Sequence, residues 1–210
     1  MKPSARLVTP LVRWAFSAVC RIDASAMSAV PPRGPLIVAI NHVNFLEVPL
    51  IYAYLYPRDA RGIVKAETWK NPIMAFLAHS WDAIPLDRDA SDLAAMRLAL
   101  DILAQGKILI IAPEGTRSGH GKLQKGQGGI VQLALKSGAP ILPVAHTGGH
   151  MFWKNLRSCR RTRFRFSVGQ PFTLASPEGP GSPVSRAVRK EMTDAVMNQL
   201  ALLLPPGQRG

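Results

Sequence analysis

Residues 36–42 of this chain read Leu36-Ile37-Val38-Ala39-Ile40-Asn41-His42, an apolar run followed closely by an imidazole. Five consecutive apolar residues without polar alternation are typical of a buried strand. In open α/β sheets, ligands bind at the carboxyl ends of the strands. His42 therefore stands where such a sheet would present a functional side chain.

A carboxylate, Glu47, follows His42 at a separation of five residues. Five residues along a helix correspond to a rotation of about 140°, so two helical residues at this spacing do not share a face. The two side chains meet only if His42 lies in a turn and Glu47 in the helix that follows. A carboxylate on one ring nitrogen would fix the tautomer and leave the other nitrogen free to take a proton, as in a general base. An isolated pair of this kind is more often structural than catalytic.

A second polar segment, residues 112–118, directly follows another apolar run at 107–111. Gly115 permits close backbone approach, Thr116 offers a hydroxyl, and Arg117 offers a planar fork suited to phosphate. Taken alone, the segment is more typical of a solvated turn. Two strand ends that both carry polar residues can nevertheless be neighbours on one edge of a sheet.

Two shorter segments complete the pattern. Residues 84–88 place Arg88 after a short apolar stretch, and residues 141–144 read as a strand bracketed by prolines. In order and spacing, the four segments resemble the four motif blocks of the glycerolipid acyltransferase family, which includes the 1-acylglycerol-3-phosphate acyltransferases. The third block, at residues 113–118, is the most specific match, and the fourth is the least specific.

The resemblance implies transfer of an acyl group from a thioester, acyl-CoA or acyl-carrier protein, to the glycerol hydroxyl of a lysophospholipid. The expected acceptor is 1-acylglycerol-3-phosphate, in phospholipid synthesis. His42 would remove the hydroxyl proton, with Glu47 as its partner, and neither a covalent acyl-enzyme nor a cofactor is implied.

By the same resemblance, Arg88 and Arg117 would hold the phosphate of the acceptor, and Lys65 resembles a family lysine that lies near the same site. Three further residues, Glu114, Gly115 and Thr116, would shape the acceptor pocket.

The chain departs from the family pattern at Glu47, where the family has Asp. The extra methylene moves the carboxylate by on the order of 1 Å, and a misplacement of that size can cost about 10²-fold in rate. Both carboxylates accept hydrogen bonds only, so the tautomer-fixing role survives. The alternative is a non-catalytic or divergent lipid-binding relative that acts on another acceptor.

The composition of the chain restricts the classes of binding partner that we expect. The 210 residues fit one domain, and 26 Lys and Arg against 13 Asp and Glu give a formal charge of +13. This excess favours a polyanionic partner, which could be nucleic acid, anionic lipid or a phosphorylated substrate. A nucleic-acid module would not explain His42 and Glu114 at strand ends, so we expect no nucleic acid. The cysteines, Cys20 and Cys159, fit no disulfide or metal pattern and indicate a reducing compartment.

The sequence lacks the signatures of two other classes of protein, the serine hydrolases and the nucleotide-binding proteins. No Gly-x-Ser-x-Gly motif of a serine hydrolase occurs, and the glycines at 126–129 form an incomplete nucleotide-binding loop. His146 and His150 are four residues apart, but the glycines between them argue against a helical metal site. We therefore expect no metal.

The first 30 residues are predicted to form an amphipathic membrane-associating segment. Its apolar stripe consists of Leu7, Val8, Leu11, Trp14, Ala15 and Ala18, flanked by Lys and Arg. A basic helix that carries Trp is suited to a membrane interface, and no run is long enough to span a bilayer. Packing of this helix on the domain is the alternative. We expect a peripheral protein on anionic membranes at the cytoplasmic face.

Alternation of strand and helix patterns predicts an α/β fold with a single domain at 31–205, a largely parallel sheet and flanking helices. Helices are expected from Ser91 or Asp92 to Gly106 and over the ranges 126–136 and 184–204. Further strands are expected at 107–111, 141–144 and 162–168. A frayed tail is expected at 206–210.

Overall fold

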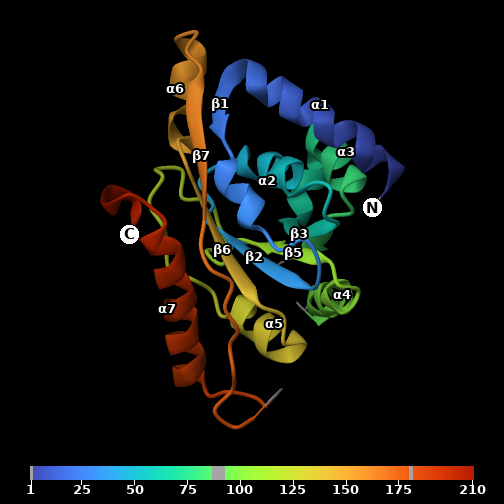
Figure 1. The fold of residues 1–210 in the computed structure, drawn as a ribbon, viewed down its shortest axis with the longest axis vertical. Helices are drawn as coiled ribbons and strands as arrows, with labels where there is room; N and C mark the ends of the chain where they lie inside the picture. The colour runs from blue at the N-terminus through green and yellow to red at the C-terminus, as the bar shows by residue number, and fades with distance from the viewer. Residues whose placement is uncertain (1, 87–92, 180–181) are drawn as a thin grey trace.

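The computed structural model describes residues 2–86, 93–179 and 182–210, which form one seven-stranded sheet with helices on both faces (Figure 1). The strands are β1 (Cys20–Asp23), β2 (Leu36–Ile40), β3 (Ala60–Lys65), β4 (Ile84–Leu86), β5 (Ile108–Ile111), β6 (Ile141–Thr147) and β7 (Thr162–Val168). The α-helices are α1 (Pro3–Val19), α2 (Glu47–Leu55), α3 (Pro72–Ser80), α4 (Leu93–Ala104), α5 (Gly129–Ser137), α6 (Phe152–Arg157) and α7 (Arg186–Leu202). Short 3₁₀ helices are η1 (Ser25–Ala29), η2 (Ala66–Lys70), η3 (Gly149–Met151) and η4 (Pro206–Gln208).

The sheet is largely parallel. Its strand order is β1-β7-β6-β2-β5-β3-β4, and each described neighbouring pair is parallel except β6 with β7. β2 lies at the centre between β5 and β6, and all five of its residues are buried. The predicted α/β class and the predicted buried strand at residues 36–40 are both confirmed.

Alternate side chains of β2 enter two different cores. Leu36, Val38 and Ile40 pack with residues of α1 and α2, whereas Ile37 and Ala39 pack with residues of α4, α5 and α7. This is the period-two alternation of a strand buried on both faces. Figure 1 shows α1 and α2 together on one side of the central strands, with α7 on the other.

The N-terminal helix packs on the domain through a different face from the predicted stripe, and the two have only Val8 in common. Its buried residues are Ala5, Val8, Thr9 and Val12. Leu7, Leu11 and Trp14, which the stripe joined to Val8, are 79%, 61% and 70% exposed. α1 is apolar on more than one side, so docking against α2 and α3 covers one side and leaves the other in solvent.

Two predicted boundaries differ from the structure because of tertiary contacts. The helix expected at 126–136 begins at Gly129, because the preceding segment passes tightly against α7; a Cβ on Gly126 would lie 2.6 Å from Met197 Cγ. The strand expected at 141–144 continues to Thr147, where β7 still pairs with it. The expected helix start at Ser91 or Asp92 lies outside the described residues.

The prediction of a frayed C-terminal tail is wrong. The carbonyl of Gln208 accepts the backbone N–H of Leu123 at 2.9 Å, and Arg209 Nε donates to the carbonyl of Leu204, also at 2.9 Å. These bonds tie the tail to the body of the protein.

Candidate functional site

Several of the predicted site residues that the structure describes lie at one edge of the sheet. His42 follows β2, Glu114 follows β5, and Lys65 is the last residue of β3. These three strands are parallel neighbours, so their carboxyl ends meet at the same edge. The adjacent strand β6, also parallel to β2, brings His146 to this edge.

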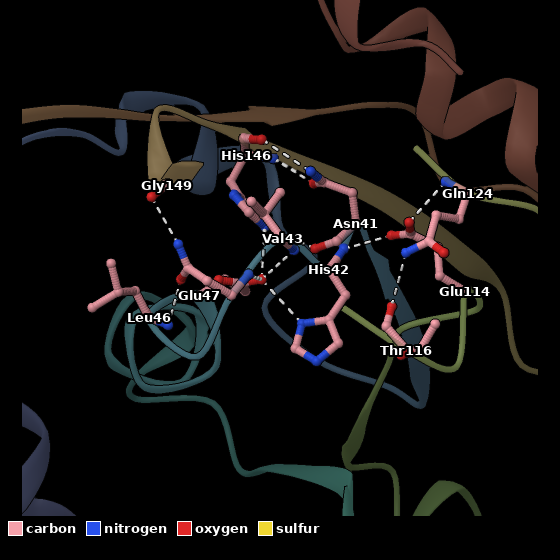
Figure 2. A network of polar contacts seen from close by, with 11 residues as sticks. Asn41, His42, Val43, Leu46, Glu47, Glu114, Thr116, Gln124, His146 and Gly149 are labelled. Carbon is pink, nitrogen blue, oxygen red and sulfur yellow. Dashed lines mark hydrogen bonds and ion pairs between the residues drawn. The ribbon is translucent and has the colours of Figure 1, made fainter. Parts of the chain in front are cut away.

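His42 and Glu47 are in contact. His42 Nδ1 lies 3.0 Å from Glu47 Oε1, with His42 in the turn after β2 and Glu47 as the first residue of α2 (Figure 2). The carboxylate can only accept, so Nδ1 carries the hydrogen and Nε2 keeps its lone pair. The His42 side chain is 20% exposed, whereas that of Glu47 is fully buried. The buried carboxylate thus orients the imidazole, whose partly exposed ring can be reached by a proton donor from solvent.

The same carboxylate oxygen organises the turn. Glu47 Oε1 accepts the backbone N–H groups of Val43 and Asn44, the latter at 2.6 Å. A carboxylate in the first turn of a helix also interacts favourably with the helix dipole. Burial alone would raise the pKa of Glu47, but the hydrogen bond from His42 leads the opposing influences, which outweigh burial and hold the pKa below its ordinary value. Glu47 is therefore an anion at neutral pH.

Glu114 supports the histidine from the other side. Its Oε1 accepts the backbone N–H of His42 at 2.6 Å, and its Oε2 accepts the backbone N–H of Gln124 at 2.8 Å. The side chain is buried. Burial raises the pKa of Glu114 against the lowering effect of these two bonds. Within the described structure, this carboxylate faces the backbone of the turn.

The loop that follows β5 is bonded directly to the turn that carries His42. Ser118 N–H donates to the carbonyl of His42 at 2.8 Å, and Gly119 N–H donates to the carbonyl of Val43 at 3.0 Å. Gly115 has a φ of +68°, a conformation that favours glycine. Thr116 and Arg117 lie between Gly115 and Ser118 in the sequence, and both are exposed.

Of the three cations predicted at or near the phosphate site, the structure describes two. Lys65 is half-buried and Arg117 is exposed, and neither forms a hydrogen bond or ion pair within the described part of the chain. Both side chains are thus available to an anion. Arg88 lies outside the described residues.

Sequence reasoning missed three side chains of this site. His146 is buried beside Glu47, and Asn41 bonds to it across β2 and β6. Asn44 Nδ2 donates to the carbonyl of Gly149 at 2.7 Å and its Oδ1 accepts Leu46 N–H at 2.8 Å, which fixes the start of α2. Asn41 directly precedes His42 and Asn44 follows it two residues later, and these polar residues after an apolar run were the available signal. Among the residues that the structure describes, no three His, Cys, Asp or Glu side chains form a metal-binding group.

Comparison with known proteins gives consistent matches. The family model described as "Acyltransferase" matches residues 21–147. A "1-acyl-sn-glycerol-3-phosphate acyltransferase" of Limnanthes alba is 30% identical over 151 residues, which are 70% of this chain and 52% of the relative. A "Lyso-ornithine lipid O-acyltransferase" of Pseudomonas aeruginosa is 31% identical over 146 residues, which are 66% of this chain and 55% of the relative. The chain thus spans about half the length of these curated relatives.

A solved structure shares the fold. It is the "1-acyl-sn-glycerophosphate (LPA) acyltransferase, PlsC" of Thermotoga maritima, with a TM-score of 0.68 at 23% identity, over 91% of this chain and 76% of that chain.

Proposed function

Because this chain belongs to the Acyltransferase family, we propose that it transfers a fatty acyl group from an acyl thioester to the hydroxyl of a lysophospholipid. Family membership confirms the resemblance found in the sequence. The observation that carries the proposal is the contact between His42 Nδ1 and Glu47 Oε1, at the edge where parallel sheets bind ligands.

The reaction needs one base and no covalent intermediate on the protein. The acceptor hydroxyl gives its proton to His42 Nε2 as its oxygen attacks the thioester carbonyl. The tetrahedral adduct then expels the thiolate, which takes the proton from the imidazolium and leaves as a thiol. Glu47 holds the tautomer and stabilises the imidazolium formed between these steps. General base catalysis contributes typically 10²–10⁴-fold, so positioning of both substrates supplies much of the remainder.

Catalysis also needs Glu47 to remain charged. Its lowered pKa supports this role, since a protonated Glu47 would accept the Nδ1 hydrogen more weakly and could not stabilise an imidazolium through its charge. Three N–H donors converge on Oε1 of Glu47 and accommodate Glu in place of the family's Asp. They are the ring Nδ1–H of His42 and the backbone N–H groups of Val43 and Asn44.

We assign the acceptor phosphate to Arg117, Lys65 and Arg88, with Glu114, Gly115 and Thr116 around it. Arg117 and Lys65 have no partner within the described structure, and the chain carries a formal charge of +13, so an anionic head group is favoured. The expected acceptor is 1-acylglycerol-3-phosphate. One relative's name specifies a lyso-ornithine lipid, which makes that lipid the main competing acceptor.

We further propose that the protein works at the cytoplasmic face of an anionic membrane, through the outer face of α1. Leu7, Leu11 and Trp14 are exposed there, and Ile73 and Phe76 of the adjacent α3 are 67% and 59% exposed. Figure 1 shows the two helices side by side. Exposed apolar groups among basic residues suit an interface where both substrates partition. In the described residues, no helix has the length and apolarity needed to cross a bilayer.

The test is acyl transfer by the purified chain. Acyl-CoA and acyl-carrier protein are offered as donors with a panel of lysophospholipids that includes 1-acylglycerol-3-phosphate and lyso-ornithine lipid. We expect preferred acylation of the phosphate monoester acceptor and none by His42→Ala. Binding of lysolipid without turnover on any donor would support the non-catalytic alternative instead.

A further inference from the structure

His146 is the one fully enclosed imidazole beside the candidate base within the described structure. It is the penultimate residue of β6, and its side chain is 2% exposed. Its ring stacks on that of Phe164, with centroids 5.1 Å apart and an interplanar angle of 10°. Phe164 is itself buried, so packing fixes the plane of the imidazole.

Three hydrogen bonds join His146 to Asn41. His146 N–H donates to Asn41 Oδ1 at 2.8 Å, and Asn41 Nδ2 donates to the His146 carbonyl at 3.1 Å. The ring makes the third contact, between His146 Nε2 and the carbonyl oxygen of Asn41, at 2.7 Å (Figure 2). A carbonyl oxygen only accepts, so the ring hydrogen is on Nε2.

The third bond matters because of the peptide that it holds. The carbonyl of Asn41 and the N–H of His42 belong to the same planar peptide unit. His146 binds the oxygen of this unit, and Glu114 binds its hydrogen at an N···O distance of 2.6 Å. The backbone that carries the base is thereby clamped at both ends of one rigid plane.

The imidazole of His146 also faces the partner of the base. Its Nε2 lies 3.8 Å from Glu47 Oε1, the oxygen that contacts His42. His146 Nδ1 is buried without a hydrogen-bond partner in the described structure. A charged ring would leave that N–H unsatisfied, which is costly in a buried site. Consistently, burial lowers the pKa of His146 despite the opposing influence of Glu47.

We propose that His146 is a positioning residue for acyl transfer: a buried imidazole whose Nε2–H fixes the Asn41–His42 peptide and so sets the place of the base. The inference rests on the proposed function. It extends the site from the pair His42 and Glu47 to a buried second histidine on a different strand, and it gives Asn41 the role of holding that histidine.

Three variants test the proposal. His146→Phe keeps a ring that can stack on Phe164 but removes the Nε2–H donor, while the two backbone bonds to Asn41 remain possible. His146→Gln replaces the ring but offers an amide N–H that can reach the same carbonyl. Leu142→Val is the matched control, because Leu142 lies on the same face of β6, in the apolar core, four residues away.

The first readout is steady-state kinetics on folded protein. We expect His146→Phe to lower kcat at least about tenfold, on the scale of a displaced catalytic group, with the KM of the acceptor within about threefold. His146→Gln should recover kcat to within about threefold of the parent. Leu142→Val should leave kcat unchanged. Parent-like kcat for His146→Phe, or equal losses in His146→Phe and Leu142→Val, would overturn the proposal.

The second readout does not depend on activity. Amide hydrogen exchange should become faster at His42, Val43 and Asn44 in His146→Phe, whereas Leu142→Val should affect the strand amides of β6 instead. If the parent protein transfers no acyl group, the proposed function fails, and the exchange pattern still tests the clamp. Unchanged protection of residues 42–44 in His146→Phe would show that His146 does not position the base.

Discussion

His42 and Glu47 meet through a single oxygen, with Nδ1 of the imidazole 3.0 Å from Oε1 of the carboxylate. That oxygen also accepts the N–H groups of Val43 and Asn44, so one atom both builds the turn and orients the base. Glu47 should therefore be sensitive to two separate changes, the loss of its charge and the loss of its length.

Glu47→Gln removes the charge at nearly constant size. We expect kcat to fall by about 10²-fold or more, because the amide stabilises an imidazolium poorly. Glu47→Asp keeps the charge but withdraws it by on the order of 1 Å, and we expect a smaller loss, at most about 10²-fold. Circular dichroism checks the fold of each variant. Equal activity of Glu47→Gln and the parent would show that the carboxylate has no part in catalysis.

Arg117→Lys separates charge from geometry at the proposed phosphate site. The ammonium keeps the charge but loses the planar two-point contact, so the KM of the acceptor should rise while that of the donor changes little. Arg186→Lys is the control, since Arg186 is an exposed arginine at the start of α7 and is not among the proposed phosphate-binding residues. A rise confined to the KM of the acyl donor would move Arg117 to the donor site.

His146 should make the protein less stable at mildly acidic pH. Its pKa is lowered in the folded state, mainly by burial, so the unfolded chain binds the proton more readily. Stability is therefore lost as pH falls below about 6.5, the ordinary pKa of histidine. The lowered pKa of Glu47 affects stability only at lower pH, as the pH falls below the ordinary pKa of a carboxylate. The effects of His146 and Glu47 therefore fall in separate pH ranges.

Urea unfolding of the parent and His146→Gln at pH 7 and pH 5.5 measures this effect. The free energy of unfolding should fall more steeply with acid in the parent than in the variant. Parallel pH dependence of the two proteins would mean that His146 titrates alike in the folded and unfolded states.

Membrane binding is tested at the exposed side of α1. Replacing Leu7, Leu11 and Trp14 with Ser should weaken sedimentation with anionic vesicles, because it removes the inserting groups. Leu202→Ser on α7, at a leucine that is 65% exposed, is the matched control. Deleting α1 would be a poor test, since Ala5, Val8 and Val12 belong to the core. Undiminished binding by the triple variant would leave α1 with a packing role alone.

Much of the fold follows from local sequence pattern. The run at 36–40 is apolar because both faces of β2 are buried, and this is visible without a structure. β3 was not predicted, because it begins with Ala60 and Arg61. Arg61 is buried, and its charge is matched by Asp59 and Asp82, partners that only the fold reveals.

The candidate site likewise combines a contact that the local sequence predicts with a contact that it does not predict. His42 and Glu47 are five residues apart, so their contact follows from local geometry once a turn and a helix are assumed. Asn41 and His146 are 105 residues apart, and their bonding depends on the register of β2 with β6. Local spacing carries no information on such a pair.

The proposed role of His42 as the general base is tested by His42→Ala. Acyl transfer from a thioester donor to a lysophospholipid is measured for the parent and for the variant, with thermal unfolding to establish that both are folded. We expect a loss of at least about 10²-fold in kcat with little change in the unfolding temperature. A folded variant that retains more than about a tenth of the parent activity would contradict it.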